Sequence, residues 1–216
     1  MKKIIVFLNL FLYIFSFCQI NTEEIKKNVL ESPKTYYHDY LEIFRTEPTK
    51  LTQQELNQMY YGSRFIQSEY EMRDYNKDYE KVWKLAKSGM SKNKASKIIE
   101  QAQANYDKNP LLKGVALKLS YIYEALGNKE KKDLYYLQNS LITQTIENSG
   151  TGKSEDSPIC VIWPGDVLGM IPRLPRVSNT PDFKQKMENL PDGSMLTTYS
   201  VGNNKIFVKL VGGFRL

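Results

Sequence analysis

Few side chains in this sequence have the types and the spacing that catalysis requires. The chain of 216 residues contains one His and two Cys, which excludes a site built from several His and a four-Cys zinc site. His38 and Cys160 could form a thiol–imidazole pair, but a nucleophilic thiol needs a partly exposed, electropositive setting, and Cys160 lies in an apolar run. We therefore expect a packed thiol and a surface imidazole, and we predict no catalytic residue.

Two short motifs resemble ligand-binding loops but lack residues that such loops need. Gly152, Lys153 and Ser154 spell the end of a phosphate-binding loop, although Glu147 stands where its first Gly belongs. Residues 74–78 have the alternating oxygen side chains of a calcium loop, without the Gly and the closing Glu that should follow. We expect a flexible turn and a polar connector at these places, and we predict no metal and no cofactor.

The chain has 24 Asp and Glu residues, and these carboxylates leave one enzymatic alternative open. An envelope hydrolase would need two acids within reach of one substrate, and paired helices could bring Asp39 or Glu42 close to Glu55. The spacing of these residues does not itself favour such a pair.

Tyrosine is abundant in this sequence, and its side chain is suited to binding other molecules. The chain has 15 Tyr, and many lie between residues 36 and 79. A rigid ring with a hydrogen-bonding tip can stack on a sugar or hold a peptide. We expect most of these rings in the core and a few exposed along a recognition surface. The candidates for this surface are Tyr36, Tyr60, Tyr61, Tyr70 and Tyr75.

The first eighteen residues predict an export signal. Two lysines precede the apolar run Ile4–Phe17, and Cys18 supplies a small side chain for cleavage before Gln19. The run is shorter than the roughly 20 residues of a membrane span. Acylation of Cys18 in a lipoprotein is the less favoured alternative, because bulky Phe17 precedes it. We expect an exported protein, periplasmic or secreted, with no membrane span after cleavage.

The elements that must position these residues are mainly helices. Apolar stripes at helical spacing run from Ile25 to Ile146 and predict six helices joined by short connectors. Thr52 and Glu55 predict a capping box, and Gly127 a left-handed helix end. The stripes cover residues 37–44, 56–63, 79–90, 95–106, 115–126 and 134–146. We expect a mainly α fold in which the helices form an antiparallel array.

The pattern changes after residue 148. Residues 149–157 contain no apolar side chain and predict a linker or long turn. Residues 158–216 predict a small α/β module, which follows a helical repeat-like domain at 19–148. Its expected elements are a strand at Ile159–Trp163, a short helix from Thr180 to Glu188, and a hairpin of the strands Ser194–Val201 and Lys205–Val211.

Residues 91–146 resemble tetratricopeptide repeats, in which paired helices carry small residues at their crossing. Lys132 departs from that pattern, because it stands where a small Ala normally packs. The matching residues are Pro110, Leu119, Tyr123, Gly127 and Tyr136.

A second resemblance is to an uncharacterised domain-of-unknown-function family of exported proteins from Gram-negative bacteria. The residues that carry it are Leu51, Thr52, Glu55, Met59, Tyr60, Tyr61, Gly62 and the loop Gly150–Ser154. The resemblance covers residues 30–165, and residues 164–216 fit that family poorly. The family has no established activity, so the resemblance implies no catalytic residue.

These observations predict a non-enzymatic binding or scaffolding protein of the cell envelope, with a protein or peptide partner held in a groove of the helical array. The formal net charge of +6 is a mild excess. Export would separate the protein from nucleic acid, so we do not expect nucleic acid as a partner. The hydrolase with paired carboxylates is the alternative.

Overall fold

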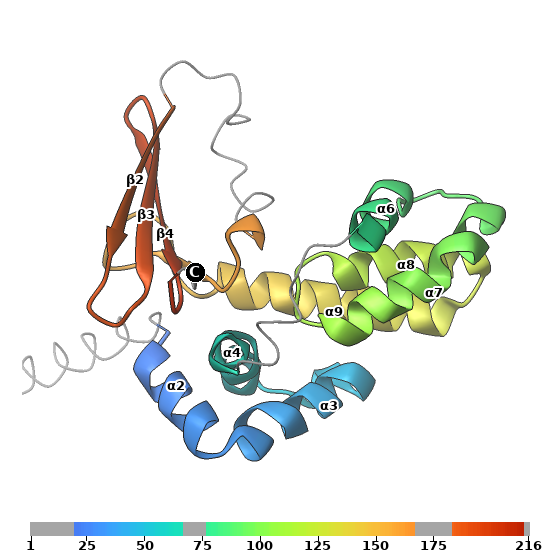
Figure 1. Cartoon of the computed structure of the whole chain (residues 1–216), viewed down its shortest axis with the longest axis horizontal. Helices are drawn as coiled ribbons and strands as arrows, with labels where there is room; N and C mark the ends of the chain where they lie inside the picture. Colours follow the sequence, from blue (N-terminus) through green and yellow to red (C-terminus); the bar gives the residue numbers. More distant parts are fainter. Residues whose placement is uncertain (1–19, 67–76, 167–182, 214–216) are drawn as a thin grey trace, which may run out of the picture.

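The computed structural model describes residues 20–66, 77–166 and 183–213. This part of the chain is mainly helical and ends in a small four-stranded sheet (Figure 1), as the sequence predicts. The helices are α2 (Thr22–Glu31), α3 (Asp39–Thr46), α4 (Gln53–Gly62), α6 (Lys77–Leu85), α7 (Lys92–Lys108), α8 (Val115–Leu126) and α9 (Lys129–Glu147). The strands are β1 (Ile159–Val161), β2 (Phe183–Asn189), β3 (Met195–Val201) and β4 (Asn204–Leu210).

Local capping signals set several helix ends. The Thr52 hydroxyl accepts a hydrogen bond from the Glu55 N–H, and the Glu55 carboxylate accepts one from the Thr52 N–H at 2.8 Å, which confirms the predicted capping box. Gly127 ends α8 in the left-handed conformation at φ 79°. The apolar stripes did not predict α2 as a separate helix, because its buried apolar side chains are only Ile25 and Val29.

A five-residue π-helical segment, Lys34–His38, joins α2 to α3. Its wider turn buries Tyr37 completely and leaves Tyr36 partly exposed. Short π-helical segments are rare and often lie at functional sites. This one forms part of the groove described below.

Two hydrophobic clusters hold the described residues together. The first core joins α2–α4 to the end of α9 and to the sheet, and the second core joins α6, α7, α8 and α9. Figure 1 shows α9 running from the second group of helices toward the sheet. Along it, Tyr135 belongs to the second core, and Ile142 and Ile146 belong to the first. The first core therefore includes residues on both sides of position 148.

The sheet has the strand order β1-β4-β3-β2. The hairpin of β3 and β4 turns at Gly202, as predicted, at φ 57°. β1 pairs with β4 in parallel, with Ile159 opposite Val208. The predicted helix through Glu188 is wrong, because residues 183–189 form β2 and pair with β3 along their whole length. Tertiary pairing there overrides the helical propensity of Lys, Gln, Met and Glu.

The predicted linker at residues 149–157 forms an ordered loop against the sheet. The Gly152 N–H donates to the Ser157 carbonyl at 2.7 Å, and the Gly152 carbonyl accepts from the Phe207 N–H at 2.9 Å. The Ser149 hydroxyl accepts from the Cys160 N–H at 2.7 Å. These bonds fix the direction in which the chain leaves α9 and enters β1.

The turn between β2 and β3 is tied to α2 and β4 through Asp192. Its carboxylate accepts from Lys209 at 2.7 Å, from the Ser194 N–H at 2.9 Å and from the Thr22 hydroxyl at 3.3 Å. Burial by itself would raise the pKa of Asp192, but the bonds from Lys209 and Ser194 outweigh it and lower the pKa.

We expect Asp192→Asn to change the acid limb of the stability curve. Because the folded pKa is below the unfolded value of about 3.9, Asp192 stabilises the fold above that pH and loses its contribution as the pH falls through the folded pKa. The variant should be less stable at pH 7 by on the order of 1 kcal/mol and should lose less stability than the wild type between about pH 5 and pH 2. Urea denaturation at a series of pH values measures this. The exposed Asp39→Asn is the control, and equal pH profiles for Asp192→Asn and the wild type would contradict the expectation.

Candidate functional site

A polar groove of about 280 Å³ opens between α2, the π-helical segment, α3 and α4. Its described lining consists of Asn28, Tyr36, Tyr40, Thr52, Gln54, Glu55 and Gln58. The volume is just below the range of about 300–1,000 Å³ that is typical of small-molecule sites. The groove can therefore hold one side chain or a group of similar size.

The walls of this groove are fixed by buried polar contacts. Gln58 is almost fully buried; its amide NH₂ donates to the Ile25 carbonyl at 3.1 Å, and its amide oxygen accepts from Asn28 at 3.1 Å. α2 also lies very close to α4, because a Cβ added at Gly62 would come within 2.6 Å of a Val29 methyl group. These contacts hold the two helices in one relative position.

The electrostatic character of the groove is negative. Glu55 is a carboxylate, and no Lys or Arg occurs among the described lining residues. Burial raises the pKa of the Tyr40 hydroxyl, and the nearby Glu55 and Asp39 carboxylates and the Tyr36 hydroxyl raise it further. A negative ligand would therefore be repelled here.

The predicted recognition tyrosines divide into three groups. Tyr36 lines the groove and is partly exposed. Tyr60 and Tyr61 are fully buried, so their predicted place on a recognition surface is wrong. Tyr70 and Tyr75 lie outside the described residues.

Tyr60 and Tyr61 are buried because α4 packs on α2, α9 and the sheet. The Tyr61 hydroxyl donates to the Cys160 carbonyl at 3.0 Å, and burial raises its pKa well above the usual value. The Tyr60 hydroxyl donates to the buried Asp166 carboxylate at 2.7 Å. Lys113 donates to the Asp166 carbonyl at 3.2 Å, and burial lowers the pKa of Lys113.

Tyr60→Phe should destabilise the fold by about 1–3 kcal/mol, because it removes a donor from a buried carboxylate and leaves the ring in place. Urea denaturation at pH 7 measures the loss. Tyr136→Phe removes a hydroxyl from a ring that is 56% exposed and should cost almost nothing. A Tyr60→Phe variant as stable as Tyr136→Phe would show that Asp166 does not depend on Tyr60.

Sequence reasoning missed most of the groove. Glu55 could be placed through its capping box, and Gln58 lies three residues further along the same helix. Asn28 and Tyr40 come from other elements, and only the packing of α2, α3 and α4 brings them to Glu55. No local motif in the sequence signals this convergence.

The carboxylate pair of the hydrolase alternative does not form in this groove. Glu55 lines it, but Asp39 and Glu42 are exposed on α3 and are not among its described lining residues. One oxygen of Glu55 already accepts from both the N–H and the hydroxyl of Thr52, each at 2.8 Å. The groove therefore offers a single carboxylate from this set, and one of its two oxygens is committed to helix capping.

The other candidate positions show no convergence either. Cys160 is buried in β1, whereas His38 is exposed in the π-helical segment, so the thiol lacks the exposure that a nucleophile needs. The loop at Gly152–Ser154 hydrogen-bonds to β4 as described above. Residues 74 and 76 of the calcium-like run lie outside the described residues.

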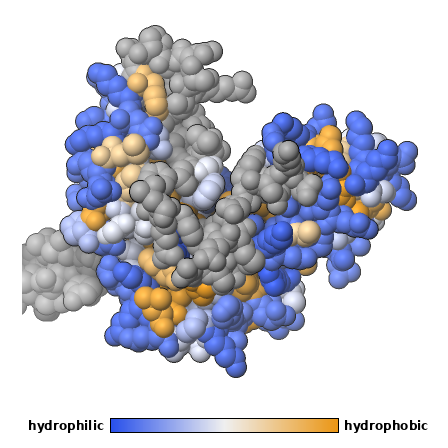
Figure 2. All heavy atoms as spheres, viewed as in Figure 1, coloured by the Kyte–Doolittle hydropathy of each residue, from blue (hydrophilic) through white to orange (hydrophobic). Residues whose placement is uncertain are grey.

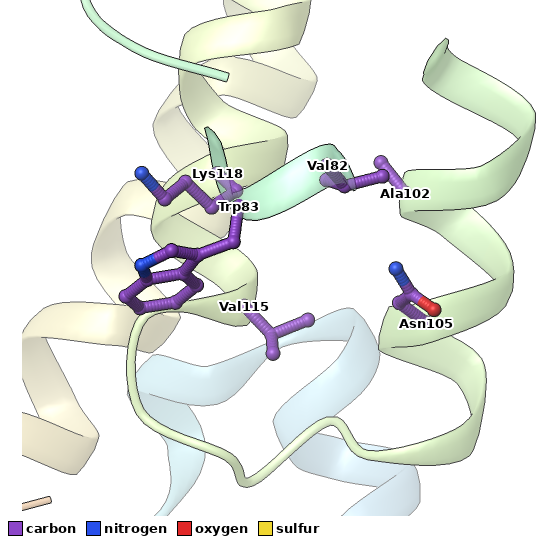
Figure 3. Close-up of a pocket in the computed structure, with 6 residues that line it drawn as sticks. All are labelled: Val82, Trp83, Ala102, Asn105, Val115 and Lys118. Carbon is purple, nitrogen blue, oxygen red and sulfur yellow. The ribbon is translucent and has the colours of Figure 1, made fainter. Parts of the chain in front are cut away.

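A second cavity, between α6, α7 and the start of α8, is only about 10 Å³ (Figure 3). The Lys118 ammonium lies 4.7 Å from the centre of the Trp83 ring and donates to the Ala86 carbonyl at 2.9 Å. Burial lowers the pKa of Lys118. The buried Asn105 amide NH₂ has no hydrogen-bond partner among the residues that the structure describes. This space is enough for about one water molecule and too small for a metabolite.

Among the coloured residues in Figure 2, hydrophilic side chains predominate, with smaller hydrophobic areas between them. The large hydrophobic side chains that are most exposed are distributed over four elements, with two of them on α6. They are Leu30, Trp83, Leu85, Tyr136 and Met187. Single exposed apolar residues of this kind are ordinary. Within residues 20–66, 77–166 and 183–213, no helix is both long enough and apolar enough to cross a bilayer.

Comparison with known families gives one match. The family described as a domain of unknown function, DUF4919, matches residues 23–187, which include the whole groove and end within β2. Comparison with curated proteins and with solved structures gives no match. The resemblance to a domain-of-unknown-function family is thus confirmed at that level, and the chain belongs to the DUF4919 family.

Proposed function

We propose that this chain is a non-enzymatic binding protein of the cell envelope, and that it holds a protein or peptide partner in the groove between α2 and α4. The observation that carries the proposal is the groove itself. It combines two partly exposed tyrosine rings with amide and carboxylate groups held by buried contacts. Rigid rings and adaptable polar groups are the chemistry of peptide recognition.

The proposed place of binding lies within the helical domain expected at residues 19–148. The groove uses α2, the π-helical segment, α3 and α4, which precede the tetratricopeptide-like residues 91–146. In the proposed arrangement α7, α8 and α9 form a repeat-like helical support. The contacts of α7 with α8 and of α8 with α9 favour it.

The export part of the proposal depends on the leader at residues 1–18. Expression of the full chain in a Gram-negative host, followed by intact mass measurement of the periplasmic fraction, tests it. We expect a mature chain that begins at Gln19. An added diacylglycerol mass on Cys18 would indicate the lipoprotein alternative, and an uncleaved cytosolic chain would contradict export.

Peptide binding can be tested with a phage-displayed peptide library selected on the purified mature protein. The groove variant Tyr36→Ala/Gln54→Ala removes a partly exposed ring and an exposed amide, and it should keep the wild-type stability. The matched control is Tyr136→Ala/Gln144→Ala on α9, outside the groove. We expect selected peptides to bind the wild type and the control and to lose at least about tenfold in affinity for the groove variant. Failure to select any peptide, or equal binding to both variants, would contradict the proposal.

A further inference from the structure

Two side-chain oxygens in the groove keep capacity to accept hydrogen bonds from a ligand. The Asn28 amide NH₂ donates to Gln58, and the Gln58 amide NH₂ donates to the Ile25 carbonyl. The Thr52 hydroxyl donates its only proton to Glu55. One N–H of each amide and the Thr52 hydroxyl proton therefore have partners within the protein, and the Asn28 amide oxygen and the second Glu55 oxygen keep capacity to accept. A ligand with hydrogen-bond donors can bind at these two oxygens.

The charges around the groove favour a positively charged ligand. Glu55 is its charged lining residue among those described, and Asp39 lies close enough to act on Tyr40. The described lining contains neither Lys nor Arg, so no lining side chain would repel a bound cation. A positive group that enters the groove meets a carboxylate without competition from a lining cation.

The rings and the size of the groove complete the recognition chemistry. Tyr36 and Tyr40 present aromatic rings to the same space of about 280 Å³. A cation over a tyrosine face is attracted by the ring, and the attraction grows when water is displaced. Charge-assisted hydrogen bonds to a carboxylate are about twice as strong as neutral ones. This combination suits an ammonium or a guanidinium group at the end of one extended side chain.

We propose that the groove binds a cationic side chain, lysine or arginine, of the partner peptide. The inference rests on the proposed function and specifies the chemistry of its ligand. Glu55 pairs with the cation, Tyr36 and Tyr40 flank it, and the Asn28 amide oxygen accepts one of its protons. Glu55 keeps its capping role, since one oxygen serves Thr52 and the other serves the ligand.

The test uses four blocked pentapeptides, acetyl-Gly-Gly-X-Gly-Gly-amide, in which X is Lys, Arg, Gln or Glu. Each is titrated at millimolar concentration into the ¹⁵N-labelled mature protein, and the side-chain amide signals of Asn28, Gln54 and Gln58 are followed by NMR. We expect saturable shifts with the Lys and Arg peptides that weaken as salt is raised. The Gln and Glu peptides should give no saturable shift.

Glu55→Gln is the decisive variant, because glutamine also serves in a capping box and so preserves the helix start. It should weaken binding of the Lys and Arg peptides about tenfold. Glu42→Gln removes an exposed carboxylate from α3 outside the groove and should leave binding unchanged. Urea denaturation confirms that both variants are folded.

The outcomes separate this inference from the proposed function. If the Gln or Glu peptide binds as well as the Lys peptide, or if Glu55→Gln has no effect, the cationic ligand is wrong and groove binding stands. If no pentapeptide shifts a groove signal, the cationic site is also wrong, and the library selection decides independently whether the groove binds peptides. If neither experiment yields binding, both proposals fail.

Discussion

Gly150→Ala should destabilise the folded chain by about 3 kcal/mol or more, because the added methyl group would overlap backbone atoms. A Cβ at Gly150 would lie 2.7 Å from the carbonyl carbon of Pro158 and 3.0 Å from the carbonyl oxygen of Ser157, and still closer to the Pro158 oxygen. Backbone cannot rotate away as a flexible side chain can. The loop would have to move, and with it the start of β1. Urea denaturation followed by circular dichroism measures the loss.

Gly89→Ala is the matched control for this prediction. Gly89 has a left-handed backbone at φ 72°, and a Cβ there would meet no atom within 4 Å. Its substitution carries only the conformational cost of a left-handed alanine, about 1–2 kcal/mol. If both variants lose the same stability, the close approach of residue 150 to residue 158 is not a determinant of the fold.

Gln138→Leu should cost about 2–5 kcal/mol, because a fully buried amide joins three helices at this point. Its NH₂ donates to the Phe44 carbonyl at 2.8 Å and to the Arg45 carbonyl at 3.2 Å, and its oxygen accepts from the Tyr106 hydroxyl at 2.8 Å. Phe44 and Arg45 lie in the last turn of α3, whose carbonyls have no partner within the helix. Gln138 on α9 therefore caps the end of α3. Leucine would leave the Phe44 and Arg45 carbonyls and the Tyr106 hydroxyl buried without this hydrogen-bond partner.

Gln144→Leu provides the control on the same helix. Gln144 is exposed, and the only described hydrogen bond of its side chain is a long one of 3.4 Å to Ser140, so this change should alter stability by less than about 0.5 kcal/mol. Unfolding of the three proteins in urea gives the comparison. A Gln138→Leu variant with the stability of Gln144→Leu would mean that water replaces the lost amide without cost.

The features that could be predicted from the sequence are those that depend on residues only a few positions apart. Thr52 with Glu55, and Gly127 after an apolar stripe, carry their own hydrogen-bonding or backbone signal, and the structure has both where expected. β2 has no such signal. Its side chains are mostly exposed, and residues 183–189 are extended because β3 lies beside them.

The candidate site shows the same limit. Tyr36 and Tyr60 are both predicted on a recognition surface, yet one lines a groove and the other is buried against Asp166. Their difference depends on which face of each element is covered by distant parts of the chain. The pairing of Asn28 with Gln58 is also a long-range contact, so the groove could not be predicted from spacing alone.

β1 pairs in parallel with β4, the last strand of the chain. Elements that are synthesised early therefore complete their packing only after the last strand has been made. Helices α2, α3 and α4 leave the ribosome first, but their shared apolar interior also needs Val208 and Leu210 from the last strand. Helices α6–α9 contact their sequence neighbours and can assemble locally, which is the faster kind of folding. The apolar faces of the earliest helices therefore stay partly uncovered until the last strand has been synthesised, and exposed apolar surface of this kind favours aggregation.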